Sequence, residues 1–96
     1  MATGTIIKTR KSKIYHQTVT NKAINTAWGS GMYITTVSVP ISISGTVLGA
    51  LVSFRGSGSS ALASLDSVTT QNASVLLARG NSASVSGTIT LEVFYE

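Results

Sequence analysis

Few side chains in this sequence could carry out catalysis. His16 is the only histidine, the acids are Asp66, Glu92 and Glu96, and cysteine is absent. A Ser–His–acid site would need His16 beside a serine and one of those acids. The Gly-Ser-Gly-Ser stretch at 56–59 is out of register with the Gly-x-Ser-x-Gly motif that exposes a nucleophilic serine. A glycosidase pair would have to draw on glutamates near the C-terminus, where a solubilising role is expected. We therefore predict that the protein is not an enzyme.

Metal and cofactor sites have equally little support. The absence of cysteine excludes thiolate sites. One histidine per chain could hold a metal only if three copies of His16 met on a threefold axis, and a structural, hydrogen-bonded His16 is the alternative. The glycine-containing stretch 56–60 has no lysine after it, so it is not a phosphate-binding loop. We predict no catalytic residue, no metal and no cofactor.

Side chains suited to ligand binding are better represented, and they fall at or beside expected turns. Aromatic rings stack on sugar faces, and arginine and asparagine offer directional hydrogen bonds to hydroxyl groups. A packing or interface role is the alternative for the tryptophan, and a solvated charge is the alternative for each arginine. The candidate ligand-binding residues are Trp28, Tyr33, Arg55, Ser57, Ser59, Arg79 and Asn81.

The net charge of +4 is concentrated near the N-terminus. Lys8, Arg10, Lys11 and Lys13 account for it, because the remaining charges cancel. We interpret residues 1–12 as a basic arm or linker and residues 13–96 as a single domain. The arm could touch phosphate, but Tyr15 is its only nearby aromatic, so a stacking platform for bases is missing. A solvated tail is the alternative, and we predict no nucleic-acid partner.

The composition is that of a β protein. The 96 residues include 15 serines, 13 threonines and 9 glycines, and valine, isoleucine and threonine together number 30. These β-branched residues fit a pleated sheet better than a helix. The hydrophobic content of 43% argues against disorder. Apolar runs are only a few residues long, so we expect no membrane insertion and no signal peptide.

Period-two alternation predicts two long half-buried strands, over residues 33–44 and 84–95. Pro40 cannot donate to a ladder, so the first strand should lie at an edge or bend there. Gly87 in the second should mark a bulge or a close backbone approach. Weaker strand patterns cover residues 13–20 and 66–70. Expected turns are residues 21–25, 71–72 and 80–82, and residues 61–65 could form one helical turn.

Two further segments, residues 46–55 and 73–79, are apolar on both sides. In the first, Leu48 is expected on the face of Ala50, and Val47 on the face of Leu51. A strand of this kind must be covered on both sides, and in a thin domain the second cover is most easily another subunit. We predict an all-β fold, a small antiparallel β-sandwich or prism-like domain that assembles as a homotrimer.

Several segments also carry a resemblance through their order and spacing. They are Asn-Thr-Ala-Trp-Gly-Ser-Gly-Met-Tyr at 25–33, Val-Pro-Ile at 39–41, Val-Thr-Thr at 68–70, Val-Leu-Leu-Ala-Arg-Gly-Asn-Ser at 75–82, and Val-Ser-Gly-Thr-Ile at 85–89. Together they resemble the C-terminal domain of bacteriophage and prophage tail-fibre proteins over about residues 13–96. That family typically shows Trp-Gly-Ser-x-Tyr, an Arg-Gly-Thr/Asn-Ser element and a Ser-Gly-Thr/Tyr strand.

The resemblance implies a homotrimer at a fibre tip that contacts a host cell-surface structure, such as a glycan, through its distal loops. The protein would be joined to an upstream fibre or virion protein, assembled in the host cytoplasm, and active outside the cell on the virion. Two other interpretations remain open. One is a structural virion component, for capsid decoration or trimerisation, without a receptor role. The other is a small lectin-like module of a bacterium.

Overall fold

The computed structural model describes residues 10–56 and 61–96, and this part of the chain forms seven strands and no helix. The all-β prediction is therefore confirmed. The strands are β1 (Lys11–Ile24), β2 (Thr26–Gly29), β3 (Met32–Pro40), β4 (Val47–Gly56), β5 (Leu62–Val68), β6 (Asn72–Arg79) and β7 (Ala83–Tyr95).

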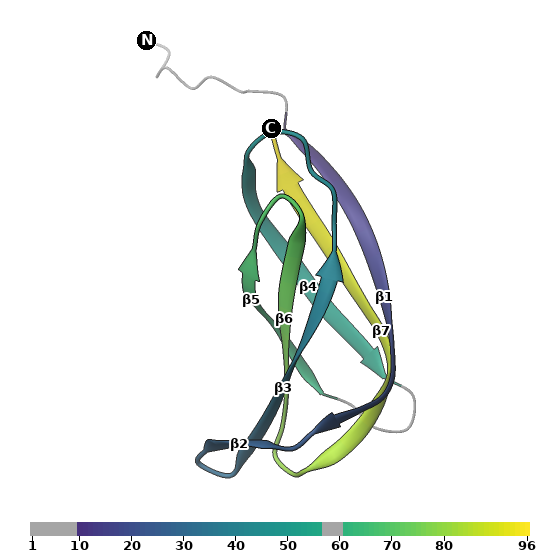
Figure 1. Cartoon of the computed structure of the whole chain (residues 1–96), viewed down its shortest axis with the longest axis vertical. Coiled ribbons are helices and arrows are strands. Elements are labelled where there is room, and N and C mark those ends of the chain that lie inside the picture. Colours follow the sequence, from purple (N-terminus) through teal and green to yellow (C-terminus); the bar gives the residue numbers. More distant parts are fainter. Residues whose placement is uncertain (1–9, 57–60) are drawn as a thin grey trace.

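The strands form two antiparallel sheets that pack face to face as a sandwich (Figure 1). The three-stranded sheet has the order β1-β7-β4, and the four-stranded sheet has the order β2-β3-β6-β5. At Ile24 and Asn25 the chain passes from the first sheet to the second, because β1 runs almost directly into β2. An elongated two-layer domain results.

The core lies between the sheets and is built on alternate residues of their central strands. Val75 and Leu77 of β6 and Ile89, Leu91 and Val93 of β7 are fully buried. Each such side chain contributes about 1.5–3 kcal/mol relative to an exposed position. The predicted alternation of residues 84–95 is thereby confirmed, since the neighbouring residues of β7 lie on the opposite face.

The helical turn expected at residues 61–65 is wrong. β5 occupies this segment and pairs with β6, Leu62 opposite Ala78 and Leu65 opposite Val75. Leu65 packs against the core while Leu62 is 73% exposed, so the spacing of three that suggested a helix reflects two faces of a strand. Pairing with a neighbouring strand outweighs a five-residue helix pattern, because so short a helix has little stability of its own.

The face assignment at the start of β4 is also wrong. Val47 lies opposite Tyr95 and Gly49 opposite Phe94, so Leu48 is an extra residue in a β-bulge. The bulge turns Val47 toward the core and leaves Leu48 half exposed. A period-two pattern cannot anticipate this reversal, because one inserted residue exchanges the faces of everything before it.

The strand expected over residues 33–44 ends at Pro40. Beyond it, the Ile41 and Ile43 amides donate to the carbonyls of Gln71 and Thr70, which carries the chain across to the other sheet with both side chains buried. The expected edge position of Pro40 is confirmed, since β2 pairs only with residues 32–34 of β3.

β1 is longer than the expected strand over residues 13–20. It begins at Lys11, so Lys11 and Ser12 pair with Tyr95 and Phe94 instead of belonging to the arm. The turn expected at 21–25 is a bulge within β1, where the Asn21 amide donates to Ser86 Oγ at 2.9 Å. The close backbone approach expected at Gly87 is confirmed, because its Cα faces the Arg55 carbonyl.

Strand direction gives the sandwich two distinct ends. The terminal end carries the start of β1, the end of β7 and the β5–β6 turn, since Lys11 pairs with Tyr95. The loop end carries the β2–β3 turn, the β6–β7 turn, the end of β4 and the start of β5. β7 alone separates the two ends by about 40 Å at about 3.3 Å per residue.

Tyr15 ties β1 to the β3–β4 connection at the terminal end. Its hydroxyl donates to the Ser42 carbonyl at 2.9 Å and accepts from the Ser42 amide at 3.1 Å. We expect Tyr15→Phe to lower the free energy of unfolding by about 1 kcal/mol, measured by urea titration, because exposed Ser42 can turn to water instead. The control is Tyr33→Phe, whose hydroxyl makes no hydrogen bond within the described residues. Equal losses from both substitutions would contradict the assignment.

Candidate functional site

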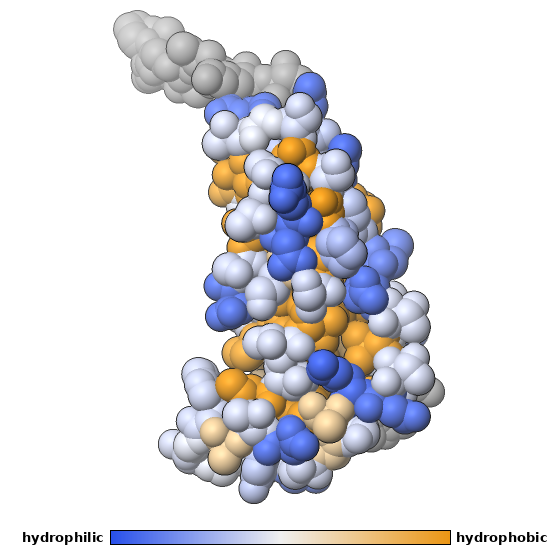
Figure 2. Space-filling view, viewed as in Figure 1, coloured by the Kyte–Doolittle hydropathy of each residue, from blue (hydrophilic) through white to orange (hydrophobic). Residues whose placement is uncertain are grey.

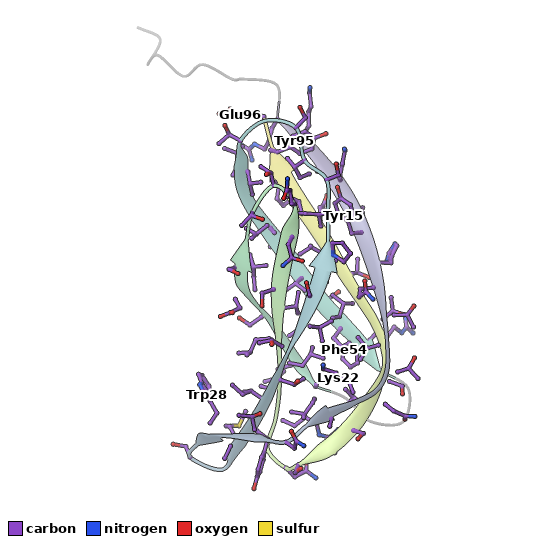
Figure 3. The ribbon with its side chains drawn as sticks, in the orientation of Figure 1. Tyr15, Lys22, Trp28, Phe54, Tyr95 and Glu96 are labelled. Carbon is purple, nitrogen blue, oxygen red and sulfur yellow. The ribbon has the colours of Figure 1, made fainter. Side chains whose placement is uncertain are left out.

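An exposed tryptophan marks the loop end. Trp28 lies at the end of β2, is 63% exposed, and projects from the ribbon there (Figure 3). The following turn has positive φ at Gly29, Ser30 and Gly31, which glycine adopts without strain. The tight turn brings Met32 opposite Gly29 and so beside the tryptophan.

An open pocket of about 510 Å³ lies next to this hairpin, on the four-stranded sheet. Two of its lining residues are cross-strand neighbours, because the register places Leu62 of β5 opposite Ala78 of β6. Hydrophobic side chains reach the surface at this end (Figure 2). The pocket is lined by Met32, Ala61, Leu62, Ala78, Arg79, Gly80 and Asn81.

Arg79 and Asn81 form the polar side of the pocket. Arg79 Nε and Nη2 donate to Asn81 Oδ1 at 3.2 and 3.0 Å, so the β6–β7 turn holds the guanidinium in a fixed plane. A fixed planar fork can donate to carboxylate, phosphate or paired hydroxyl oxygens. The pocket therefore combines apolar walls with a directional donor group.

Of the residues proposed from sequence, Arg79 and Asn81 line the pocket together, and Trp28 lies at the same end, on the β2–β3 hairpin. Tyr33 also lies at this end but packs against the core, so its ring serves the fold. Arg55 is exposed on the other sheet, opposite Thr88, and does not line the pocket. The candidates Ser57 and Ser59 lie outside the described residues.

The apolar walls were not identified from sequence. Met32, Leu62 and Ala78 are ordinary hydrophobic residues, far apart along the chain, and only the strand order β3-β6-β5 makes them neighbours. One signal was available, since Leu62 is an apolar residue next to a glycine- and serine-rich stretch. An apolar side chain beside a turn often has no core to enter.

A second exposed apolar surface lies on the outer face of the three-stranded sheet. Ile14 and Leu51 are 58% and 64% exposed and flank Glu92 in one cross-strand row, and Leu48 projects nearby. A shallow hollow of about 170 Å³ lies around Leu51 and Glu92. His16 is on this face, with Nδ1 3.2 Å from Thr90 Oγ1. We call this surface the three-stranded face.

Within residues 10–56 and 61–96, no three histidine, cysteine or acidic side chains gather in a way that could bind a metal ion. The same residues contain no helix of the length and apolarity needed to cross a membrane. Comparisons with protein-family models, with curated proteins and with solved structures found no match to this chain.

Proposed function

We propose that this protein is a receptor-binding module of the phage tail-fibre type, which recognises a host cell-surface glycan through the pocket at its loop end. One observation carries the proposal. Trp28, Arg79, Asn81 and the apolar pocket gather at the end of the sandwich opposite Glu96, which Figure 3 shows at the other extreme. Binding groups gathered at one end of an elongated domain suit a fibre tip.

The chemistry of the pocket fits a sugar. Apolar walls accept the C–H face of a pyranose ring, and an exposed indole offers a stacking surface beside them. The Arg79 fork and the Asn81 amide supply the few oriented polar groups that fix a ligand in such a site. We propose no catalysis, no cofactor and no nucleic-acid partner for this site.

The proposed assembly is a homotrimer joined to an upstream fibre or virion protein, located on the virion and acting outside the cell after assembly in the host cytoplasm. The three-stranded face supports self-association, because Ile14, Leu48 and Leu51 are exposed apolar side chains on one side of a small domain. Three identical shallow pockets would raise avidity without strong single-site affinity.

The same face supports a second candidate function, that of a structural or trimerisation component of a virion. In that case the trimer would form and the pocket would bind no glycan. Trp28 would then contact another virion protein. Both candidates share the fold and the assembly. Ligand binding at the loop end distinguishes them.

We expect Trp28→Ala and Arg79→Ala each to weaken glycan binding about tenfold or more, since buried aromatic and arginine groups dominate binding energies. The measurement is binding to an array of bacterial surface polysaccharides, followed by titration of the best ligand. The melting temperature should stay nearly unchanged for Trp28→Ala, because an exposed side chain contributes within about half a kcal/mol. Arg79→Ala should cost no more than about 1 kcal/mol, because it removes hydrogen bonds to exposed Asn81.

Arg10→Ala is the matched control, an exposed arginine at the terminal end. It should leave affinity unchanged. If the intact protein binds no glycan while remaining a trimer, the structural role is favoured. If Trp28→Ala abolishes binding and Arg79→Ala does not, the site lies on the hairpin and not in the pocket.

A further inference from the structure

We infer that the loop-end pocket selects an anionic glycan, one that carries a carboxylate or phosphate group. The inference rests on the proposed glycan-binding function and adds the ligand's charge. It comes from three features of the described chain, namely where the acids lie, where the cations lie, and which hydrogen-bonding groups the pocket presents.

All three acidic side chains lie away from the pocket. Glu96 is at the terminal end. Glu92 is on the outer face of the other sheet, three positions before β7 ends at Tyr95. Asp66 is four residues beyond Leu62 along β5, which at about 3.3 Å per residue places it about 13 Å from the pocket wall. No carboxylate opposes an anion at this site.

Of the described basic residues, those outside the terminal end lie on the loop-end half of the molecule. Arg79 lines the pocket, Lys22 pairs with Val85 near the start of β7, and Arg55 pairs with Thr88. Charges are screened over about 10 Å at 0.1 M salt, so this half carries a positive potential that the distant acids do not cancel. A negatively charged ligand is attracted to it.

Hydrogen bonding points the same way. The Asn81 side-chain oxygen accepts from Arg79, because a guanidinium can only donate, and this fixes the Asn81 amide NH₂ as a donor facing elsewhere. The other described lining side chains are aliphatic or methionine. Among the described lining side chains, the one amide oxygen, Asn81 Oδ1, already accepts two bonds from Arg79, and no carboxylate is present. These side chains therefore offer donors to a ligand and leave the hydroxyl hydrogens of a neutral sugar without an acceptor.

The ligand that satisfies this pocket is rich in acceptors. A carboxylate or phosphate accepts charge-assisted hydrogen bonds from a guanidinium, which are stronger than the bonds a neutral hydroxyl makes. The apolar walls then hold the sugar ring that bears the charged group. A uronic-acid polysaccharide and a phosphate-containing wall polymer share this chemistry.

The test uses the full chain and three probes in calorimetric titration at low and high NaCl. They are an oligogalacturonate, the same oligosaccharide with its carboxyls reduced to neutral galactose, and poly(glycerol phosphate). We expect an anionic probe to bind at least about tenfold more tightly than the neutral one, with affinity falling as salt rises. If the oligogalacturonate binds most tightly, the ligand is a sugar with a carboxylate. If poly(glycerol phosphate) binds most tightly, the ligand is a phosphate polymer.

Variants separate the pocket from general attraction of anions. Arg79→Ala should remove the preference for the anionic probe, Arg79→Lys should retain part of it, and Arg10→Ala should leave it intact. Equal loss from Arg10→Ala and Arg79→Ala would overturn the inference in favour of non-specific charge. Tight, Trp28-dependent binding of the neutral probe would overturn the inference and keep the proposed function. Failure of every probe and every arrayed glycan would overturn both.

Discussion

Gly87→Ala is expected to destabilise the protein by about 3 kcal/mol, the upper part of the range for overpacking a tight site. A Cβ at this position would lie 2.2 Å from the Arg55 carbonyl oxygen and 2.7 Å from the Gly56 Cα. Both neighbours are backbone atoms of β4, so no side-chain rotation relieves the clash. β7 would have to separate from β4 where their pairing ends, at Arg55 and Gly56.

The control for Gly87 is Gly49→Ala, in β4 of the same sheet. A Cβ on Gly49 meets nothing within 4 Å, so its cost should stay within about half a kcal/mol. In thermal melts, Gly87→Ala should lower the melting temperature by more than about 10 °C, since 1 kcal/mol corresponds to about 4–8 °C for a domain of this size. Equal melting temperatures for the two variants would show that the strands separate more easily than the structure indicates.

Gly87 also illustrates what the sequence could predict about the fold. A glycine within a strong alternating pattern indicates a close approach or a bulge, and the structure has a close approach at Gly87 itself and a bulge in the paired strand β1. Alternation likewise identified β7 and most of β3, because burying one face of a strand imposes a period of two on its side chains. β6 was predicted as a strand that is apolar on both sides.

The position of a bulge, such as the one at Leu48, could not be predicted from the sequence. A bulge arises when one strand fits an extra residue against a partner, so it depends on the partner's register and not on the local pattern. The same holds for residues 61–65, where pairing with β6 decides the conformation. Local sequence predicts which residues prefer strands, and the three-dimensional arrangement decides how they pair.

Some residues of the candidate site could likewise be predicted from the sequence, and others could not. Trp28, Arg79 and Asn81 could be proposed from residue type and from their places beside turns. The rest could not be, since only the pairing of β3 with β6 places the hairpin that carries Trp28 at the same end of the sheet as the β6–β7 turn. A pocket assembled from three non-consecutive strands has no signature in a single stretch of sequence.

Leu91→Ala is expected to destabilise the fold of the chain, and Leu51→Lys to weaken the assembly of chains, although the two residues lie on neighbouring strands. Leu91 is fully buried and pairs with Val52, so its truncation should lower the free energy of unfolding by about 2–5 kcal/mol at fixed protein concentration. Leu51 is 64% exposed and pairs with Glu92, so a lysine there gains an opposite charge across the strands and should spare the fold of the single chain.

In the proposed homotrimer, Leu51→Lys should instead reduce the assembly, because it places a charge in the apolar three-stranded face. Light scattering should give three times the chain mass of 9.9 kDa for the intact protein and a lower mass for this variant. The matched substitution Leu62→Lys, at a 73% exposed leucine of the other sheet, should leave the trimer unchanged.

A stable monomer of the intact protein at micromolar concentration would contradict the trimer. Dissociation caused by Leu62→Lys alone would move the subunit contact to the four-stranded sheet, where it would cover the loop-end pocket and remove the basis for glycan binding there.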